Sequence, residues 1–272
     1  MRYKLLRRLG LLGVAFAISG VGLTGCLDEP DIPVIERMMT PLRIVNVMVD
    51  VENPPAVDVW IDSTRFANIG YTDVVDYTDI PSGTRFLRVT LSGNDTTEAI
   101  LRGEIFLRSL TQTTMVLQGR PFEIPPPDPG DPDDQGGPSI TVTQERFTYS
   151  DETAALPADS GTIKFIHCIV ASRRDVKLGE LDFRGIRMSG GEPVDTTFIN
   201  NVFSPPVENT DRPNLSSFTK FPVGSYDMSI IFPTPRNQFS MEVERKRWTF
   251  IYSGILDAGQ IKHENLLKLE TP

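Results

Sequence analysis

The chain has 272 residues, a formal net charge of −9, and 39% hydrophobic and 23% charged residues. This composition supports a packed core, excludes wholesale disorder and argues against a basic nucleic-acid-binding protein. Only two cysteines and two histidines are present, which excludes a disulfide scaffold and a zinc-finger array. The length allows one large domain or two ordinary ones.

Residues 1–25 have the features of a secretory signal. Basic residues near the start are followed by an uncharged, mostly apolar run over 9–25 that is short for a membrane span. This run ends in Leu23-Thr24-Gly25-Cys26, which resembles the bacterial lipobox. The resemblance implies that cleavage leaves Cys26 as a lipidated first residue, with palmitate among its acyl chains. The alternative is an ordinary signal peptide, or an N-terminal membrane anchor, with an accidental cysteine.

The residues after the cysteine indicate where such a lipoprotein would lie. Asp at the next position is associated with inner-membrane retention in Gram-negative lipoproteins, whereas this chain has Leu27 there. The same resemblance therefore implies an outer-membrane lipoprotein, facing the periplasm or exposed at the surface. Residues 26–41 contain Pro30 and Pro33 and no periodic pattern, so we interpret them as a flexible tether.

From Leu42 onward the pattern is that of an all-β protein. Residues 42–49 are apolar and β-branched, 57–62 alternate between apolar and polar, and 86–91 form a further apolar run. Short strands at intervals of about 8–12 residues predict a β-sandwich or barrel. The best helical candidate, 97–107, is also interpreted as a strand.

An internal repeat predicts two copies of one domain. The matched segments are 42–47 with 163–168, 77–84 with 218–225, and 114–119 with 249–254. Three matches in the same order predict domains over 42–152 and 160–272, with a linker over 153–159. The Pro/Asp-rich stretch 125–138 is placed as a long loop inside the first domain, because the second copy has its last strand at the corresponding point.

Three segments of the first copy carry a resemblance to a known family. They are Pro55–Asp62, Phe66–Tyr71 and Tyr77–Gly83, which resemble the Pro-Ala-Val-Asp-Val strand, the tyrosine-bearing loop and the Pro-x-Gly turn of the domain-of-unknown-function family 4397. The resemblance implies immunoglobulin-like or transthyretin-like β-sandwich domains outside the cytoplasm, and it implies no reaction.

The second copy resembles the family more loosely. It lacks the Ala-Val-Asp-Val strand and has 177–183 near that position. Its loops are expected to be enlarged around 189–213.

The acidic residues give weak candidates for chemistry. Asp58 and Asp62 lie on one face of a strand, about 13 Å apart, which is far for a carboxylate pair, so we expect solvent-facing polarity. The cluster Asp73, Asp76 and Asp79 is compatible with a cation or sugar site, although capped turns are the simpler interpretation. The loop acids, Asp128, Asp131, Asp133 and Asp134, offer oxygen ligands for calcium, but without EF-hand spacing a solvated loop is expected.

No catalytic or metal site is expected from the two histidines, Cys168 or the basic run 245–247. His167 and Cys168 are adjacent on a strand, so their side chains point to opposite faces and cannot form a nucleophile–base pair. Cys168 aligns with Val47 and is expected to be buried, whereas His263 lies far along the chain from His167. The basic run 245–247 is interpreted as a solvated strand edge, with an anion or partner contact as the alternative.

The sequence therefore predicts a non-enzymatic cell-envelope lipoprotein that acts as a binding or scaffolding module. No catalytic residue, metal site or cofactor is expected beyond the lipid on Cys26. Trp60, Tyr71 and Tyr77 are candidate contacts for an envelope protein or a polysaccharide, and nucleic acid is not expected. The alternatives are an accessory subunit of a polysaccharide-uptake or secretion system and, more remotely, a hydrolase.

Overall fold

The computed structural model describes residues 38–121, 145–150, 155–172, 181–202, 216–232, 234–257 and 259–271. The expected signal, Cys26, most of the tether and the stretch 125–138 lie outside the described residues. Among the described residues, no helix has the length and apolarity needed to span a bilayer.

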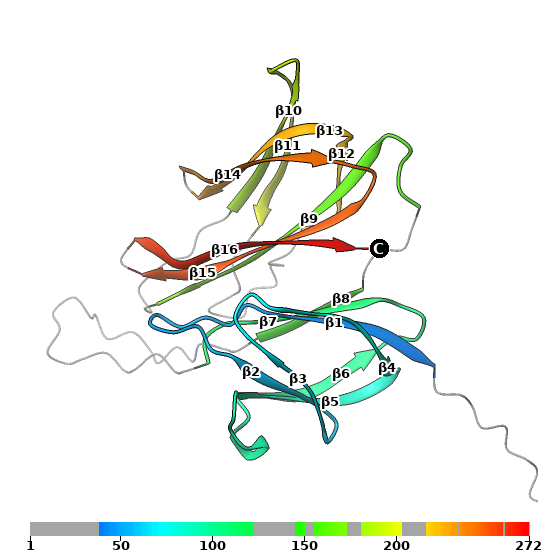
Figure 1. The fold of residues 1–272 in the computed structure, drawn as a ribbon, viewed down its shortest axis with the longest axis vertical. Helices are drawn as coiled ribbons and strands as arrows, with labels where there is room; N and C mark the ends of the chain where they lie inside the picture. The colour runs from blue at the N-terminus through cyan, green and yellow to red at the C-terminus, as the bar shows by residue number, and fades with distance from the viewer. Residues whose placement is uncertain are drawn as a thin grey trace, which may run out of the picture. The chain divides into compact units, whose positions relative to one another are not determined.

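The first half of the chain forms two four-stranded sheets (Figure 1). The strand orders are β4-β1-β7-β8 and β3-β2-β5-β6. The strands are β1 (Met39–Asn46), β2 (Val57–Ile61), β3 (Thr64–Ile69), β4 (Val74–Pro81), β5 (Gly83–Leu91), β6 (Leu101–Leu107), β7 (Thr113–Gln118) and β8 (Glu145–Ser150). We call this pair of sheets the first sandwich.

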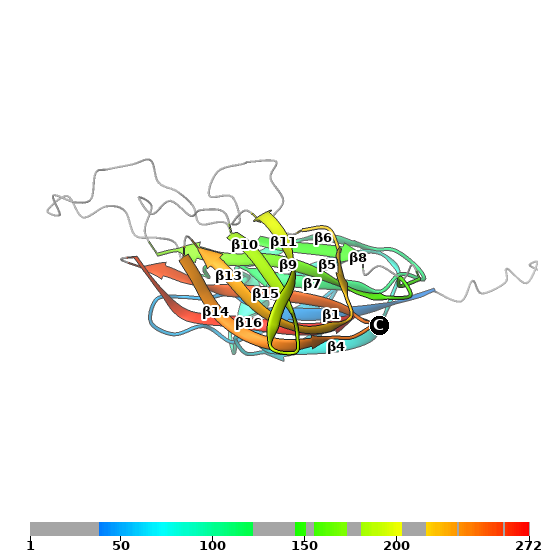
Figure 2. The same ribbon diagram turned by 90° about the horizontal axis from the view of Figure 1, so that it is seen from above.

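The second half repeats the arrangement strand for strand, with sheet orders β12-β9-β15-β16 and β11-β10-β13-β14. The strands are β9 (Ser160–Ala171), β10 (Leu181–Ser189), β11 (Glu192–Val202), β12 (Thr219–Pro222), β13 (Gly224–Phe232), β14 (Thr234–Val243), β15 (Arg247–Asp257) and β16 (Gln260–Thr271). Figure 2 shows the same strands from above. The predicted all-β fold of two tandem sandwich domains is confirmed.

The register of the central strands follows the repeat seen in the sequence. β1 runs parallel to β7 with Arg43 opposite Thr114, and β9 runs parallel to β15 with Lys164 opposite Thr249. The two Pro-x-Gly turns also occupy equivalent places, since each carries the chain from one sheet to the other. Gly83 and Gly224 there have φ angles of 102° and 146°, which an L side chain rarely adopts.

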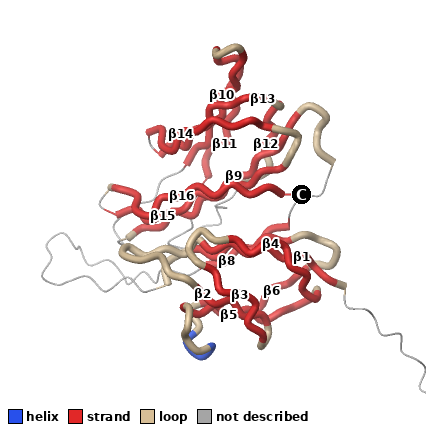
Figure 3. The backbone as a smooth tube through the Cα atoms, viewed as in Figure 1, coloured by secondary structure: helices blue, strands red, loops and turns tan. Residues whose placement is uncertain are grey.

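Two local expectations were wrong. Residues 192–202, expected within an enlarged loop, form β11, whose β-branched and aromatic side chains favour a strand. The start of the segment 97–107 is a 3-10 turn, η1 (Thr96–Glu98), in which the Asp95 side chain accepts a hydrogen bond from the Thr97 N–H. This turn is the blue segment of Figure 3, and β6 follows it as expected.

Each sandwich has its own apolar core between its two sheets. The core of the first is formed mainly by aliphatic side chains such as Leu42, Val59 and Leu87. The core of the second is rich in aromatic rings, with Phe183 in contact with the Phe165 and Phe250 rings at centroid distances of 5.1 and 5.3 Å.

A third cluster joins the two sandwiches through one sheet of each. It consists of Val45, Val47, Val116, Ile166, Cys168, Ile251 and Leu269, and we call it the shared interface. Because this cluster covers the second face of the central strands, β7 and β9 are buried along their whole length. Strands buried on both faces read as continuous apolar runs, which explains the texture of 42–49 and 163–171.

Candidate functional site

Trp60 is the one predicted contact residue that faces outward. It lies half-buried on the outer face of the β3-β2-β5-β6 sheet, between Arg65 on β3 and Arg88 on β5. Its indole N–H is enclosed and has no acceptor among the described residues. Trp60 therefore belongs to a surface on which a ligand could pack.

Tyr71 lies between the sandwiches. Its hydroxyl donates to the carbonyl oxygen of His263 at 2.6 Å and lies 3.1 Å from Ser253 Oγ. Burial in this interface raises the pKa of the Tyr71 phenol. The side chain joins the two halves of the molecule.

Tyr77 packs within the first sandwich. The Arg43 guanidinium carbon lies 4.7 Å from the centre of the Tyr77 ring, in cation–π geometry. The equivalent pair in the second sandwich is Lys164 and Phe218, with the ammonium 4.2 Å from the ring centre. The aromatic residue that opens each Pro-x-Gly motif thus packs against a cation from the first strand of its copy.

Asp58 was expected to face solvent, but it is only 3% exposed. Its carboxylate accepts hydrogen bonds from Arg65 at 2.5 Å, Asn68 at 2.6 Å and the Gly93 N–H at 3.1 Å. Burial acts to raise the pKa of Asp58, but these three donors outweigh it and leave the pKa below its usual value. The prediction failed because the local strand pattern did not reveal donors from β3 and the turn after β5.

Of the remaining acidic candidates that are described, Asp62 and Asp73 take part in turns. Asp76 and Asp79 are exposed positions within β4, so the capped turns expected there are absent. Asp62 is exposed, as expected, and accepts a hydrogen bond from the Phe86 N–H at 3.0 Å. Asp73 caps the turn that begins at Gly70, accepting its N–H at 3.1 Å, which confirms a capped turn there. The described residues contain no group of three or more His, Cys, Asp or Glu that could hold a metal ion.

His167 and Cys168 are both buried, and Cys168 fills the place of Val47 as predicted. Burial raises the pKa of the Cys168 thiol far above its usual value. His167 Nδ1 lies 3.2 Å from the Val202 carbonyl oxygen, much as the aligned Asn46 amide donates to the Ile69 carbonyl at 3.1 Å.

The interpretation of the basic run 245–247 as a solvated strand edge holds for the exposed Arg245 but is wrong for Arg247. β15 is an inner strand between β9 and β16, and Arg247 at its start is only 7% exposed. Arg245 donates to the carbonyls of Pro157 and Leu156, while Lys246 pairs with Glu244 and Glu270. These cations tie strand ends together.

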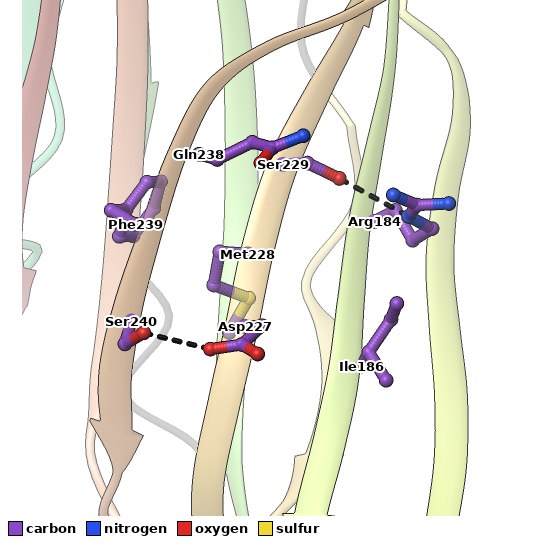
Figure 4. A pocket seen from close by; sticks show the side chains of 8 residues that line it. All are labelled: Arg184, Ile186, Asp227, Met228, Ser229, Gln238, Phe239 and Ser240. Carbon is purple, nitrogen blue, oxygen red and sulfur yellow. Dashed lines mark hydrogen bonds between the residues drawn. The ribbon is translucent and has the colours of Figure 1, made fainter. Parts of the chain in front are cut away.

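The structure adds a pocket of about 390 Å³ that the sequence did not reveal (Figure 4). It lies on the second sandwich over β10, β13 and β14. The residues that line it are Arg184, Ile186, Asp227, Met228, Ser229, Gln238, Phe239 and Ser240.

A β-bulge shapes this pocket. The register of β13 against β14 shifts between Met228 and Ile230, and Asn237 on the facing strand has a φ of 42°. Bulges re-aim side chains and interrupt regular pairing. The pocket therefore occupies the part of the sheet where the two strands depart from a regular ladder.

Two hydrogen bonds orient polar groups around the pocket (Figure 4). The Arg184 Nε–H donates to Ser229 Oγ at 3.1 Å, and the Ser240 hydroxyl donates to Asp227 Oδ1 at 2.7 Å. Gln238 is exposed and brings an amide that both donates and accepts. The alternation of apolar and polar residues from Tyr226 to Ile230 is the one sequence signal for this site, since it puts Asp227 and Ser229 on one face of a strand. It does not reveal the bulge or the facing strand.

Comparisons with known proteins support the family resemblance. Residues 41–174 match the family model described as "Domain of unknown function (DUF4397)". This match covers the first sandwich and continues through β9, whereas the resemblance of the second copy stays a prediction. None of the curated proteins matches the chain.

Among solved structures, similarity is distant. The Bacillus anthracis TIE protein is 13% identical, with a TM-score of 0.21, over 80% of this chain and 34% of that one. A leucine-rich repeat protein from Bacteroides thetaiotaomicron is 10% identical, with a TM-score of 0.19, over 80% and 26%. A structure titled "Alpha-glucan binding by a streptococcal virulence factor" is 10% identical, with a TM-score of 0.22, over 78% and 92%. This chain thus spans about a third or less of the first two proteins.

Proposed function

We propose that this protein is a non-enzymatic, lipid-anchored protein of the cell envelope that acts by binding a carbohydrate ligand. The anchor rests on the lipobox-like sequence that ends at Cys26, and Leu27 favours the outer membrane. The observation that carries the binding function is the pocket over β10, β13 and β14.

The chemistry of the pocket suits a ligand rich in hydroxyl groups. Arg184 supplies donors, Asp227 supplies acceptors, and Gln238 supplies both. Each sugar hydroxyl can both donate and accept a hydrogen bond, so the pocket offers partners for both of its roles. Ile186 adds apolar surface against which the C–H face of a sugar ring can pack, whereas the Phe239 ring packs toward the core against Phe183 and Phe250.

The arrangement of carboxylates favours binding over hydrolysis. Asp227 is the one carboxylate among the described residues that line the pocket. Glycoside hydrolysis by the usual acid–base route uses a pair of carboxylates across the scissile bond. A ligand held here would leave chemically unchanged.

Saturation-transfer difference NMR tests this function. The probes are glucose, galactose, mannose, N-acetylglucosamine and glucuronic acid, each mixed with the chain from residue 27 onward. We expect at least one sugar to receive saturation, Gln238→Ala and Asp227→Asn to abolish it, and the exposed β11 control Asn200→Ala to preserve it. Recovery of the sugar unchanged after prolonged incubation is also expected. The proposal would be contradicted if no sugar received saturation, or if the pocket variants gave the same signal as the unmodified chain. Conversion of the sugar would contradict it as well.

A further inference from the structure

A row of three arginines and a tryptophan crosses the outer face of the first sandwich. In the register of the β3-β2-β5-β6 sheet, Arg65 lies opposite Trp60, Trp60 opposite Arg88, and Arg88 opposite Arg102. Directly opposite residues share one face of a sheet, so the four side chains stand in line. With strands about 4.8 Å apart, the row is about 14 Å long.

Two exposed phenylalanines lie beside this row. Phe106 is 72% exposed and Phe86 is 37% exposed. Phe106 pairs with Thr84, and Phe86 with Glu104, so both rings stand on the same outer face. The Arg88 guanidinium lies 5.0 Å from the centre of the Phe86 ring. Apolar side chains gathered in this way on a surface mark an interaction site.

The row departs from the usual rules for a stable sheet. Arg88 and Arg102 are like charges in directly opposite positions, which destabilises a strand pair. The Trp60 indole N–H is also enclosed without an acceptor among the described residues. Local conflicts of this kind are typical of functional surfaces, where stability is given up for function.

Charge on this face is the opposite of the charge on the chain. Asp58 is already bound to Arg65, so Glu104 is the carboxylate that faces Arg88 and Arg102 among the described residues of the row. The face thus has an excess of positive charge on a chain whose net charge is −9. An anionic partner fits it by charge complementarity.

We infer that this face binds a carboxylate-bearing polysaccharide. The planar guanidinium groups of Arg88 and Arg102 pair bidentately with carboxylates, while the rings of Phe86 and Phe106 pack against the sugar rings. The length of the row exceeds one sugar and suits a segment of a chain. This second surface is on the other sandwich from the pocket, and the inference does not depend on the pocket.

Biolayer interferometry with immobilised alginate, a uronate polymer, tests the inference. Dextran serves as the neutral polymer and polyglutamate as the anionic polymer without sugar. We expect binding to alginate alone, weakening as salt rises. The double variant Arg88→Gln/Arg102→Gln should lose at least about tenfold in affinity, because two charge-assisted contacts are removed. Phe106→Ser should also weaken binding.

A matched control removes two positive charges elsewhere. Arg108→Gln/Lys220→Gln, at exposed positions outside the row, should bind alginate like the unmodified chain. Unchanged circular dichroism and an unchanged midpoint of urea denaturation would show that the row variants are folded. The inference would be overturned if the chain bound polyglutamate as tightly as alginate, or if it did not bind alginate. It would also be overturned if the control variant lost as much affinity as the row variant. Concentration-dependent dimers that Phe106→Ser abolishes would overturn it too, since a second copy would then cover the face.

Discussion

The hydroxyl of Tyr71 donates a 2.6 Å hydrogen bond to the carbonyl oxygen of His263, which lies on the other sandwich. The Arg43 guanidinium makes a second such link, donating to the Glu270 carbonyl at 2.8 Å. A third joins Arg120 to the Ser172 carbonyl, also at 2.8 Å. Together with the apolar cluster of the shared interface, these bonds make the two sandwiches one structural unit.

Removal of the Tyr71 hydroxyl should destabilise this unit. Tyr71→Phe leaves the His263 carbonyl without its donor, and we expect the free energy of unfolding to fall by about 1–2 kcal/mol. Urea denaturation followed by fluorescence measures the change. Tyr226→Phe is the control, because its buried hydroxyl has no hydrogen-bond partner among the described residues and its loss should cost little. Equal stability of Tyr71→Phe and the unmodified chain would argue against the link.

Cys168 offers a direct report on the shared interface. Its thiol is fully buried in that cluster and burial raises its pKa, so it should not react with Ellman's reagent in the native state. The experiment uses the Cys26→Ala chain, in which Cys168 is the one remaining cysteine. Tyr71→Phe should speed the labelling by easing local opening. Rapid stoichiometric labelling of the native protein would contradict the packing described.

Asp58 should make stability depend on pH at the acid end. Because its pKa is lowered on folding, its contribution is complete well above 3.8, the usual pKa of an aspartate carboxyl, and is lost as pH falls through the folded pKa. Asp58→Asn should lower the free energy of unfolding by about 1–3 kcal/mol at neutral pH, with the difference shrinking in acid. Denaturation of both chains between pH 7 and pH 2 checks this. The exposed Asp62→Asn is the control, and a constant difference across the range would be inconsistent with the Asp58 contacts.

Lipidation at Cys26 has a simple test in a bacterial host that processes lipoproteins. Radiolabelled palmitate should enter the unmodified chain and not Cys26→Ala, because the thiol is the site of attachment. The matched control is Cys168→Ala, which should label normally if it is expressed to the same level. Labelling of Cys26→Ala would disprove the anchor.

The internal repeat allowed a large part of the fold to be predicted. Aligning 42–47 with 163–168 and 114–119 with 249–254 makes Arg43 equivalent to Lys164 and Thr114 equivalent to Thr249, and the structure gives both pairs the same register. The reason is that β-branched apolar strands and Pro-x-Gly turns are local features, so each copy specifies the same order of strands.

The contacts between elements could not be predicted in the same way. The continuous apolar run in β9 indicates burial on both faces, but nothing in it says that the first sandwich covers the second face. The prediction that Asp58 faces solvent was wrong for a similar reason, since Arg65, Asn68 and Gly93 come into contact with Asp58 only when the strands pair. The pocket depends on a register shift at Met228, which no periodicity encodes.

Chemical-shift mapping tests the central claim of carbohydrate binding most directly. The isotopically labelled chain is titrated with the sugar that gives the strongest saturation transfer. We predict that the largest amide shifts lie on β10, β13 and β14 at the residues around the pocket, and that Gln238→Ala abolishes them while Asn200→Ala does not. Shifts confined to other strands, or no shifts at a saturating sugar concentration, would contradict the claim that the pocket binds a carbohydrate.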